Sequence, residues 1–328
     1  KKKFVKKPKD EKRSFSLWWN SLNNTDEVEL SDEKFNKKIT YKTLDTSGTL
    51  ENSLQYEVKL NYLGNNKSKN NKNILDNYLE NVEFIHYEDV IDKEKISYYK
   101  KFFEPYNTVD RKSVWMWYFR VFVLGDYLKQ TKLEHIFHSD SDNLLLKNVN
   151  ELTYTKENAY VISPDWSKNH MAASIHFGLT SHNFYEQFVS LYEDIFVTNK
   201  KFNLIEEKIK YHDEVSNGGI CDMTLFYLLN KENYIEVDNL LIPRIQNEKK
   251  YVFMNNINTG EGFKSQNQYE MLNGRIKIFT NRKEKTNLIF DKLNQEFHEI
   301  VNIHFQGKAK NQINNFLKYK LSEKGNLK

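Results

Sequence analysis

One stretch indicates both the fold and a candidate site: residues 134–146, which read Glu134-His135-Ile136-Phe137-His138-Ser139-Asp140-Ser141-Asp142-Asn143-Leu144-Leu145-Leu146. Apolar residues precede and follow two aspartates that are one residue apart. Side chains at i and i+2 of a strand point to the same face, so Asp140 and Asp142 are expected to converge at the end of a buried strand. Two converging carboxylates repel each other unless a cation lies between them. Oxygen ligands of this kind suit Mg²⁺ or Mn²⁺.

The same residues are also typical of a turn after a strand, in which Asp140 and Asn143 bond their own backbone. Short acidic pairs arise by chance in many chains. The metal-site interpretation therefore depends on the apolar flanks of the pair and on the rest of the sequence.

Apolar periodicity predicts alternating helices and strands around this stretch. Val114, Trp117, Val121, Leu124 and Leu128 recur at helical spacing. Helices are expected at 74–79, 113–128, 184–198 and from 222 to 229; strands or apolar segments are expected at 14–19, 54–63, 82–87, 136–138, 160–163, 175–180, 275–279 and 300–305. This alternation favours an α/β sheet with helices on its faces. Ligands of such sheets lie beyond the carboxyl ends of the strands.

The length of 328 residues suits one large α/β domain with additions, or two smaller domains. The formal net charge is +4, but residues 1–13 alone carry a net charge of +6, so the remaining chain is close to neutral. Residues 1–13 are expected to form a flexible, solvated leader. A weak contact of this leader with an anionic lipid, glycan or nucleic-acid surface is the alternative.

Cysteine content and hydropathy place limits on the compartment. Cys221 is the single cysteine, so no disulfide forms within the chain. No transmembrane segment or signal peptide is recognisable. These features favour a cytoplasmic protein, and they are compatible with an anchor outside this sequence.

A second informative segment is Val301-Asn302-Ile303-His304-Phe305-Gln306-Gly307-Lys308-Ala309-Lys310. A histidine ends an apolar strand, and a neutral imidazole is a good metal ligand. The glycine allows close backbone approach to a ligand, and lysine is a compact charge suited to phosphate. A hairpin or helix start with solvated lysines is the alternative.

These segments carry a resemblance to a known family. Asp140-Ser141-Asp142 resembles the Asp-x-Asp motif of metal-dependent glycosyltransferases with the GT-A fold. Residues 304–310 resemble the His-x-x-Gly-x-x-Lys motif of glycosyltransferase family 8 and its relatives, and Tyr118-Phe119-Arg120 resembles a Tyr-x-Arg segment of that family. The resemblance covers residues 110–312. It implies that Asp140, Asp142 and His304 bind Mn²⁺ or Mg²⁺, and that the donor contacts are Arg120, Asp140, Gly307, Lys308 and Lys310.

The resemblance further implies a GT-A-like, Rossmann-like mixed sheet, mostly parallel and flanked by helices, in one domain of residues 14–312 with a tail at 313–328. The implied reaction moves a sugar from a nucleotide-sugar, such as a UDP-sugar, to a hydroxyl of a glycan, protein or lipid-linked acceptor. Asp222 and Asp165 are the candidate catalytic carboxylates on the acceptor side. Both types of position are also common caps and turns. Where the family often has Asp-Gln, this chain has Asp222-Met223, and the stereochemical outcome stays open.

Other residues and other functions also fit parts of this sequence. His176 is a candidate for the donor pocket or a satisfied half-buried residue, and Trp166 is a candidate for sugar stacking or for the core. A phosphatase of the haloacid dehalogenase type also has Asp-x-Asp after a strand, but it continues differently from Asn143. A non-catalytic nucleotide-sugar- or glycan-binding module and a nucleic-acid-modifying glycosyltransferase are the remaining alternatives.

Overall fold

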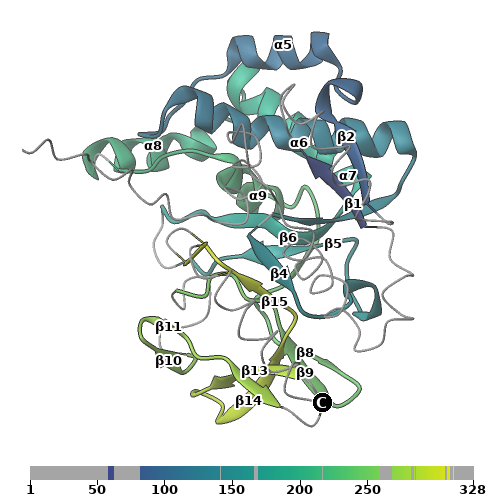
Figure 1. The fold of residues 1–328 in the computed structure, drawn as a ribbon. Helices are drawn as coiled ribbons and strands as arrows, with labels where there is room; N and C mark the ends of the chain where they lie inside the picture. The colour runs from purple at the N-terminus through teal and green to yellow at the C-terminus, as the bar shows by residue number, and fades with distance from the viewer. Residues whose placement is uncertain are drawn as a thin grey trace, which may run out of the picture.

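The computed structural model describes residues 58–62, 82–140, 142–165, 169–215, 217–258, 268–281, 284, 286–306, 309–310 and 313. Within these residues the chain is a mixed α/β protein (Figure 1). The strand predicted at 14–19, the helix predicted at 74–79, the leader at 1–13 and nearly all of the tail lie outside the described residues. No helix in the described ranges is long and apolar enough to cross a membrane.

The central sheet has four strands in the order β3-β6-β5-β7: β3 (His135–Ser139), β6 (Ala173–Ser181), β5 (Asn158–Ile162) and β7 (Val237–Asn239). β6 runs antiparallel to both β3 and β5, and β7 runs parallel to β5. β3, β5 and β7 therefore share one direction, and their carboxyl ends lie at the edge where β6 begins. Residues that follow β3 and β5 are consequently placed at this edge.

The remaining described strands form four further sheets. Three have two strands each: β1 (Val58–Tyr62) with β2 (Val82–His86); β4 (Asn143–Leu145) with β15 (Asn302–His304); and β10 (Met271–Leu272) with β11 (Arg275–Ile276). The fourth is larger than the central sheet and has, in the order β12-β13-β14-β9-β8, the strands Phe279–Asn281, Thr286–Asp291, Glu296–Ile300, Lys249–Val252 and Arg244–Gln246.

The predicted α/β class is confirmed, but the sheets differ from the mostly parallel arrangement that was expected. Among the described strands, seven of the ten pairs are antiparallel. Parallel neighbours need a crossover of a dozen or more residues, usually a helix. The link between β5 and β6, residues 163–172, is too short for one, so β6 returns antiparallel to β5.

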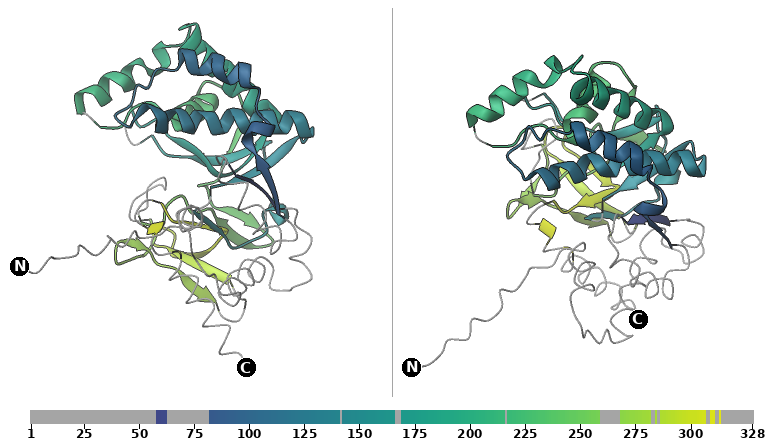
Figure 2. Two further views of the ribbon diagram at one scale, coloured as in Figure 1. Left: turned by 45° about the horizontal axis from the view of Figure 1, so that its top comes forward. Right: turned by 90° about the horizontal axis from the view of Figure 1, so that it is seen from above.

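The helices lie over one face of the central sheet, and the sheet of β8, β9, β12, β13 and β14 lies on its other side (Figures 1 and 2). The helices are α5 (Lys93–Phe102), α6 (Arg111–Thr131), α7 (His182–Tyr192), α8 (Asn203–Val215) and α9 (Asp222–Lys231), with short 3-10 turns at Tyr87–Asp89 and Val149–Glu151.

Alternation along the central strands creates two cores, because successive side chains point to opposite faces. Tyr160 is fully buried against the helices. Ala159 and Val161, its neighbours on β5, are buried on the other face, among residues of β9, β14 and β15. Within the described residues, the central sheet is therefore covered on both faces.

Helix α6 contains the predicted 113–128 segment and extends it at both ends. The Asp110 carboxylate accepts the Ser113 amide at 3.0 Å and caps the helix start. Lys132 ends the helix with a left-handed φ of 55°. Helix α7 begins two residues before the predicted start, and residues Glu193–Val197 continue it as a π-helix.

The strand predicted at 300–305 is divided between β14, which ends at Ile300, and β15. β15 leaves the larger sheet and pairs antiparallel with β4, so that His304 lies opposite Asn143. The Phe305 amide donates to the carbonyl of Asp142 at 2.9 Å. This pairing brings the C-terminal segment to the acidic pair across about 160 positions of sequence.

Candidate functional site

The two aspartates lie in a tight turn between β3 and β4. The Asp140 amide donates to the carbonyl of His176 on β6 at 2.7 Å, and the Asn143 amide donates to the carbonyl of Asp140 at 3.1 Å. The two carboxylates therefore do not share one face of a single strand, as the i, i+2 argument expected. The expected turn is present, and it directs Asp140 to Arg120 and Asp142 to other charged partners.

Asp142 lies between His304 and Lys310. Its Oδ1 is 3.6 Å from His304 Nε2, and its Oδ2 is 2.8 Å from Lys310 Nζ. The side chains of Asp142 and His304 are each only 8% exposed. Burial acts to raise the pKa of Asp142, but the hydrogen bonds and charges of His304 and Lys310 outweigh burial and lower it. Asp142 therefore stays a carboxylate in a mostly dry environment.

The tautomer of His304 is fixed by its second contact. Nδ1 lies against the carbonyl of Asn255, which can only accept, so Nδ1 carries a proton. Nε2 is directed at Asp142 Oδ1, 3.6 Å away. A proton on Nε2 or a metal ion can lie between these two atoms. This donor set fits a divalent cation.

Arg120 joins the second aspartate to Asp222. Its Nη1 is 3.0 Å from Asp140 Oδ1, and its Nη2 is 2.8 Å from Asp222 Oδ2. Burial acts to lower the pKa of Arg120, but the carboxylates of Asp140 and Asp222 raise it. Burial also raises the pKa of Asp222, and the Arg120 charge opposes that effect. Arg120 therefore lies in the cluster and contacts Asp140, one residue of the acidic pair.

Asp222 is the first residue of α9, and its side chain is 4% exposed. Its Oδ1 accepts the amide of Met223 at 2.9 Å. The capping position belongs to Cys221, whose amide faces Thr224 Oγ1 at 3.4 Å. The alternative role of Asp222 as the helix cap is therefore taken by the neighbouring residue, and its second oxygen is directed to Arg120.

His176 on β6 lies against His304. The two imidazoles stack with ring centroids 4.2 Å apart and planes inclined by 19°. Nδ1 of His176 is 2.8 Å from Ser174 Oγ, while the buried Nε2 has no hydrogen-bond partner in the described part of the chain. Burial lowers the pKa of His176 well below its usual range, and the neighbouring His304 acts in the same direction. His176 is therefore a neutral residue at the centre of the cluster.

Three further residues contribute contacts that were not among the predicted site residues. His138 contacts the carbonyl of Ile175 at 2.6 Å and has Nε2 3.7 Å from Asp140. Asn143 donates to the carbonyl of His176 at 2.9 Å, and Asn302 donates to Asn143 Oδ1 at 2.8 Å. Asn302 is an amide inside an apolar strand, which is the one signal in the sequence that pointed to a buried polar contact.

The structure does not bring Asp165 to this cluster. Asp165 follows β5, its side chain is 54% exposed, and it accepts the Tyr227 hydroxyl at 2.7 Å and pairs with Lys231 at 3.7 Å. Within the described ranges it has no contact with Asp140, Asp142 or Asp222. Asp140 and Asp165 each follow a strand, and the sequence alone did not show that only Asp140 joins the cluster. Gly307, Lys308 and Trp166 lie outside the described residues.

In the part of the chain that the structure describes, no group of three or more His, Cys, Asp or Glu side chains is arranged to hold a metal ion. The reason is the orientation of Asp140, which faces Arg120 rather than the Asp142–His304 pair. Two of the three predicted ligands are thus adjacent, and the third has a protein cation as its partner. Comparison with known protein families, curated proteins and solved structures gives no match for this chain.

Proposed function

We propose that this chain is a metal-dependent glycosyltransferase that moves a sugar from a nucleotide-sugar, such as a UDP-sugar, to a hydroxyl acceptor. The observation that carries the proposal is the meeting of Asp142, His304 and Lys310. The Asp142 carboxylate lies 3.6 Å from the His304 imidazole and 2.8 Å from the Lys310 ammonium group, and both partners are distant from it in sequence. Ligands for a cation and a charge for a phosphate are thereby adjacent.

Asp142 and His304 would hold the ion, and Asp140 is the candidate for a third ligand. One nitrogen and two carboxylates suit Mn²⁺, and Mg²⁺ is the all-oxygen alternative. Such an ion would stabilise the negative charge that develops on a nucleoside diphosphate leaving group. The fold proposed with this activity is the GT-A-like one, supported by the position of the cluster beyond the carboxyl end of β3.

The side chains have separate tasks in this proposal. Lys310 is paired with Asp142, and in this proposal its ammonium group also binds the diphosphate. Arg120 bridges Asp140 and Asp222 and therefore couples the donor side of the site to the acceptor side. The buried carboxylate of Asp222 is the candidate for orienting the acceptor hydroxyl, and the burial of His304, His176 and Asp222 excludes water.

The test is turnover of nucleotide-sugars with and without Mn²⁺, measured as released nucleoside diphosphate. Asp142→Asn is expected to lower metal-dependent turnover about 10²- to 10³-fold, because it removes one stabilising charge from the ion site. Asp213→Asn, an exposed aspartate on α8, is the matched control.

Turnover that does not depend on metal or on Asp142 would refute the proposal. Nucleotide binding without turnover would instead favour a non-catalytic binding module. That second candidate is supported by one observation: Asp140 is paired with Arg120 and Asp142 with Lys310, so both carboxylates have protein counter-charges in place of a metal ion.

A further inference from the structure

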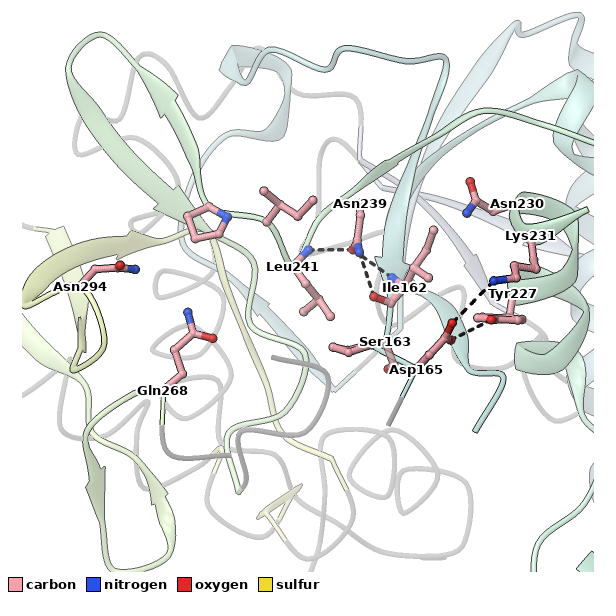
Figure 3. A pocket seen from close by; sticks show the side chains of 13 residues that line it. Ile162, Ser163, Asp165, Tyr227, Asn230, Lys231, Asn239, Leu241, Gln268 and Asn294 are labelled. Atoms are coloured by element: carbon pink, nitrogen blue, oxygen red, sulfur yellow. Dashed lines mark hydrogen bonds and ion pairs between the residues drawn. The ribbon is translucent and has the colours of Figure 1, made fainter. Parts of the chain in front are cut away.

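A cavity separate from the Asp142–His304 cluster lies at the carboxyl ends of β5 and β7, with a volume of about 570 Å³. Asn239 fixes its base: Oδ1 accepts the amides of Ile162 and Leu241 at 3.1 Å each, and Nδ2 donates to the carbonyl of Ile162 at 2.9 Å. Figure 3 shows Asn230, Tyr227 and Lys231 on one side of this base and Gln268 and Asn294 on the other. The cavity is therefore built by elements that are distant in sequence.

The chemistry of the described lining suits an uncharged, hydroxyl-rich ligand. Its one carboxylate, Asp165, is compensated by Lys231 and by the Tyr227 hydroxyl, so the lining offers no net charge to a phosphate. The amide side chains of Asn230, Gln268 and Asn294 offer both donors and acceptors, as vicinal hydroxyl groups require. Leu241, Ile242 and Pro243 add an apolar surface for the C–H face of a sugar ring.

The side chains that face this cavity are held in place before any ligand binds. The buried carboxylate of Asp291 accepts hydrogen bonds from the amides of Gln268 and Asn294 at 3.0 Å each. Asp165 accepts the Tyr227 hydroxyl at 2.7 Å. Polar groups that are fixed in advance lose less entropy when they bind a ligand, which favours specific recognition over a chance hollow.

Helix α9 connects this cavity to the cation site. Asp222 begins the helix, and Met223, Tyr227 and Asn230 follow at spacings that place them on one side of it. The eight residues from Asp222 to Asn230 correspond to a rise of about 12 Å. The sheet gives a similar separation between the two places. Asp140, in the cluster, bonds to His176, and Ser163, in the cavity lining, bonds to Ala172. Ala172 and His176 are four residues apart, which corresponds to about 13 Å along a strand.

The order of contacts places the cavity on the acceptor side of the site. Lys310 contacts Asp142, Asp140 contacts Arg120, Arg120 contacts Asp222, and α9 leads from Asp222 to Tyr227. Lys310, which is the proposed contact of the diphosphate, and the cavity are therefore at opposite ends of this series. A single sugar ring is too short to occupy both the Asp222 end and the cavity.

We propose that the cavity binds the distal sugar units of an uncharged oligosaccharide acceptor whose reacting end lies near Asp222. This inference rests on the proposed function for the identity of the acceptor, but binding in the cavity is measurable without any reaction. The acceptor class is therefore an oligosaccharide rather than a single sugar, a nucleic acid or an acidic polymer.

The experiment uses the full chain without metal or nucleotide-sugar. An array of defined uncharged and acidic glycans, from single sugars to longer chains, is screened, and retained glycans are measured by saturation-transfer NMR. Uncharged oligosaccharides are expected to bind better than single sugars. Asn230→Ala and Tyr227→Phe are each expected to weaken binding about tenfold, because each removes hydrogen bonds to the ligand. Asn183→Ala, an exposed asparagine on α7, is the matched control.

Binding that is equal for Asn230→Ala and wild type, preference for acidic glycans, or displacement of the glycan by uridine diphosphate would overturn the proposal. The absence of retained glycans would do the same. Metal-dependent donor hydrolysis by the wild-type chain is measured separately. Its absence, together with glycan binding that depends on Asn230, would refute the proposed function and leave the cavity as a glycan site.

Discussion

Single side chains in the site differ in how their charge is compensated. Arg120 serves two carboxylates at once and is itself 18% exposed, so its loss leaves Asp222 buried beside no cation that the structure describes. Removing one partner of a buried pair costs more than replacing both, because an uncompensated charge remains. Arg120 is therefore expected to contribute to folding as well as to the site.

Arg120→Met is expected to destabilise the fold by about 3 kcal/mol, because the buried Asp222 loses its cation. Adding Asp222→Asn should restore part of that loss, since no uncompensated charge is left. Urea unfolding of the two single variants and the double variant measures the coupling. Lys112→Met, on the exposed side of the same helix, is the control, and purely additive losses would contradict the pairing.

Asp291 supplies a pH dependence outside the site. It is fully buried, and burial alone would raise its pKa, but hydrogen bonds from Gln268, Leu293 and Asn294 lower it below its usual value. A group with a lowered folded-state pKa stabilises the fold above the ordinary pKa of about 3.9 and loses that contribution as pH falls through the folded-state pKa.

The free energy of unfolding is therefore expected to fall more steeply below pH 4 in the wild-type chain than in Asp291→Asn, which cannot take up this proton. Chemical unfolding at a series of pH values measures the difference between the two curves. The Asn variant is expected to be less stable at neutral pH, and parallel curves through the acidic range would contradict this role of Asp291.

Among elements, the pairing of β4 with β15 determines the geometry of the site. Asn302 is buried and holds this junction by donating to Asn143 Oδ1 at 2.8 Å and accepting the Met254 amide at 3.0 Å. His304 is two residues further along the same strand. The orientation of the imidazole is therefore inherited from the strand pairing rather than from local residues alone.

Asn302→Ala is expected to destabilise the fold by about 2–3 kcal/mol, because buried groups lose their partners. It should also weaken Mn²⁺ binding through displacement of His304. Calorimetric titration with Mn²⁺ under folded conditions separates the two effects. Asn302→Asp keeps the acceptor for the Met254 amide but directs a buried carboxylate oxygen at Asn143 Oδ1 and the Met254 carbonyl, so it should not recover the stability. Unchanged affinity in folded Asn302→Ala would show that β15 does not position His304.

Sequence reasoning was most successful where one periodicity dominates. The helix around Arg120 and the strand before Asp140 follow from apolar spacing alone, and the motif resemblance paired Asp142 with His304 and Lys310. The antiparallel return of β6 was missed, because the short apolar stretch at 175–180 carries no signal of direction. The separation of Asp165 from Asp222 was missed as well, because each follows an expected turn and only the tertiary fold distinguishes them.

At the scale of the whole molecule, the central sheet separates two cores. In the part of the chain that the structure describes, helices cover one face and β9, β14 and β15 cover the other, so a ligand is expected at the edge where β3, β5 and β7 end. Both the Asp142–His304 cluster and the cavity above Asn239 lie along that edge. Helix α9 joins them, with Asp222 at its start and Asn230 and Lys231 at its end. Under the proposed function, the donor would bind at the Asp142 end of this edge and the acceptor at the cavity end.

The most direct test of the account is electron paramagnetic resonance of bound Mn²⁺, because the central claim is that Asp142 and His304 hold a divalent ion. The wild-type chain and Asp213→Asn are expected to bind Mn²⁺ with a nitrogen hyperfine coupling from His304. His304→Gln should abolish that coupling, and Asp142→Asn should abolish binding. Mn²⁺ binding without a nitrogen coupling, or binding unchanged in both variants, would contradict the claim.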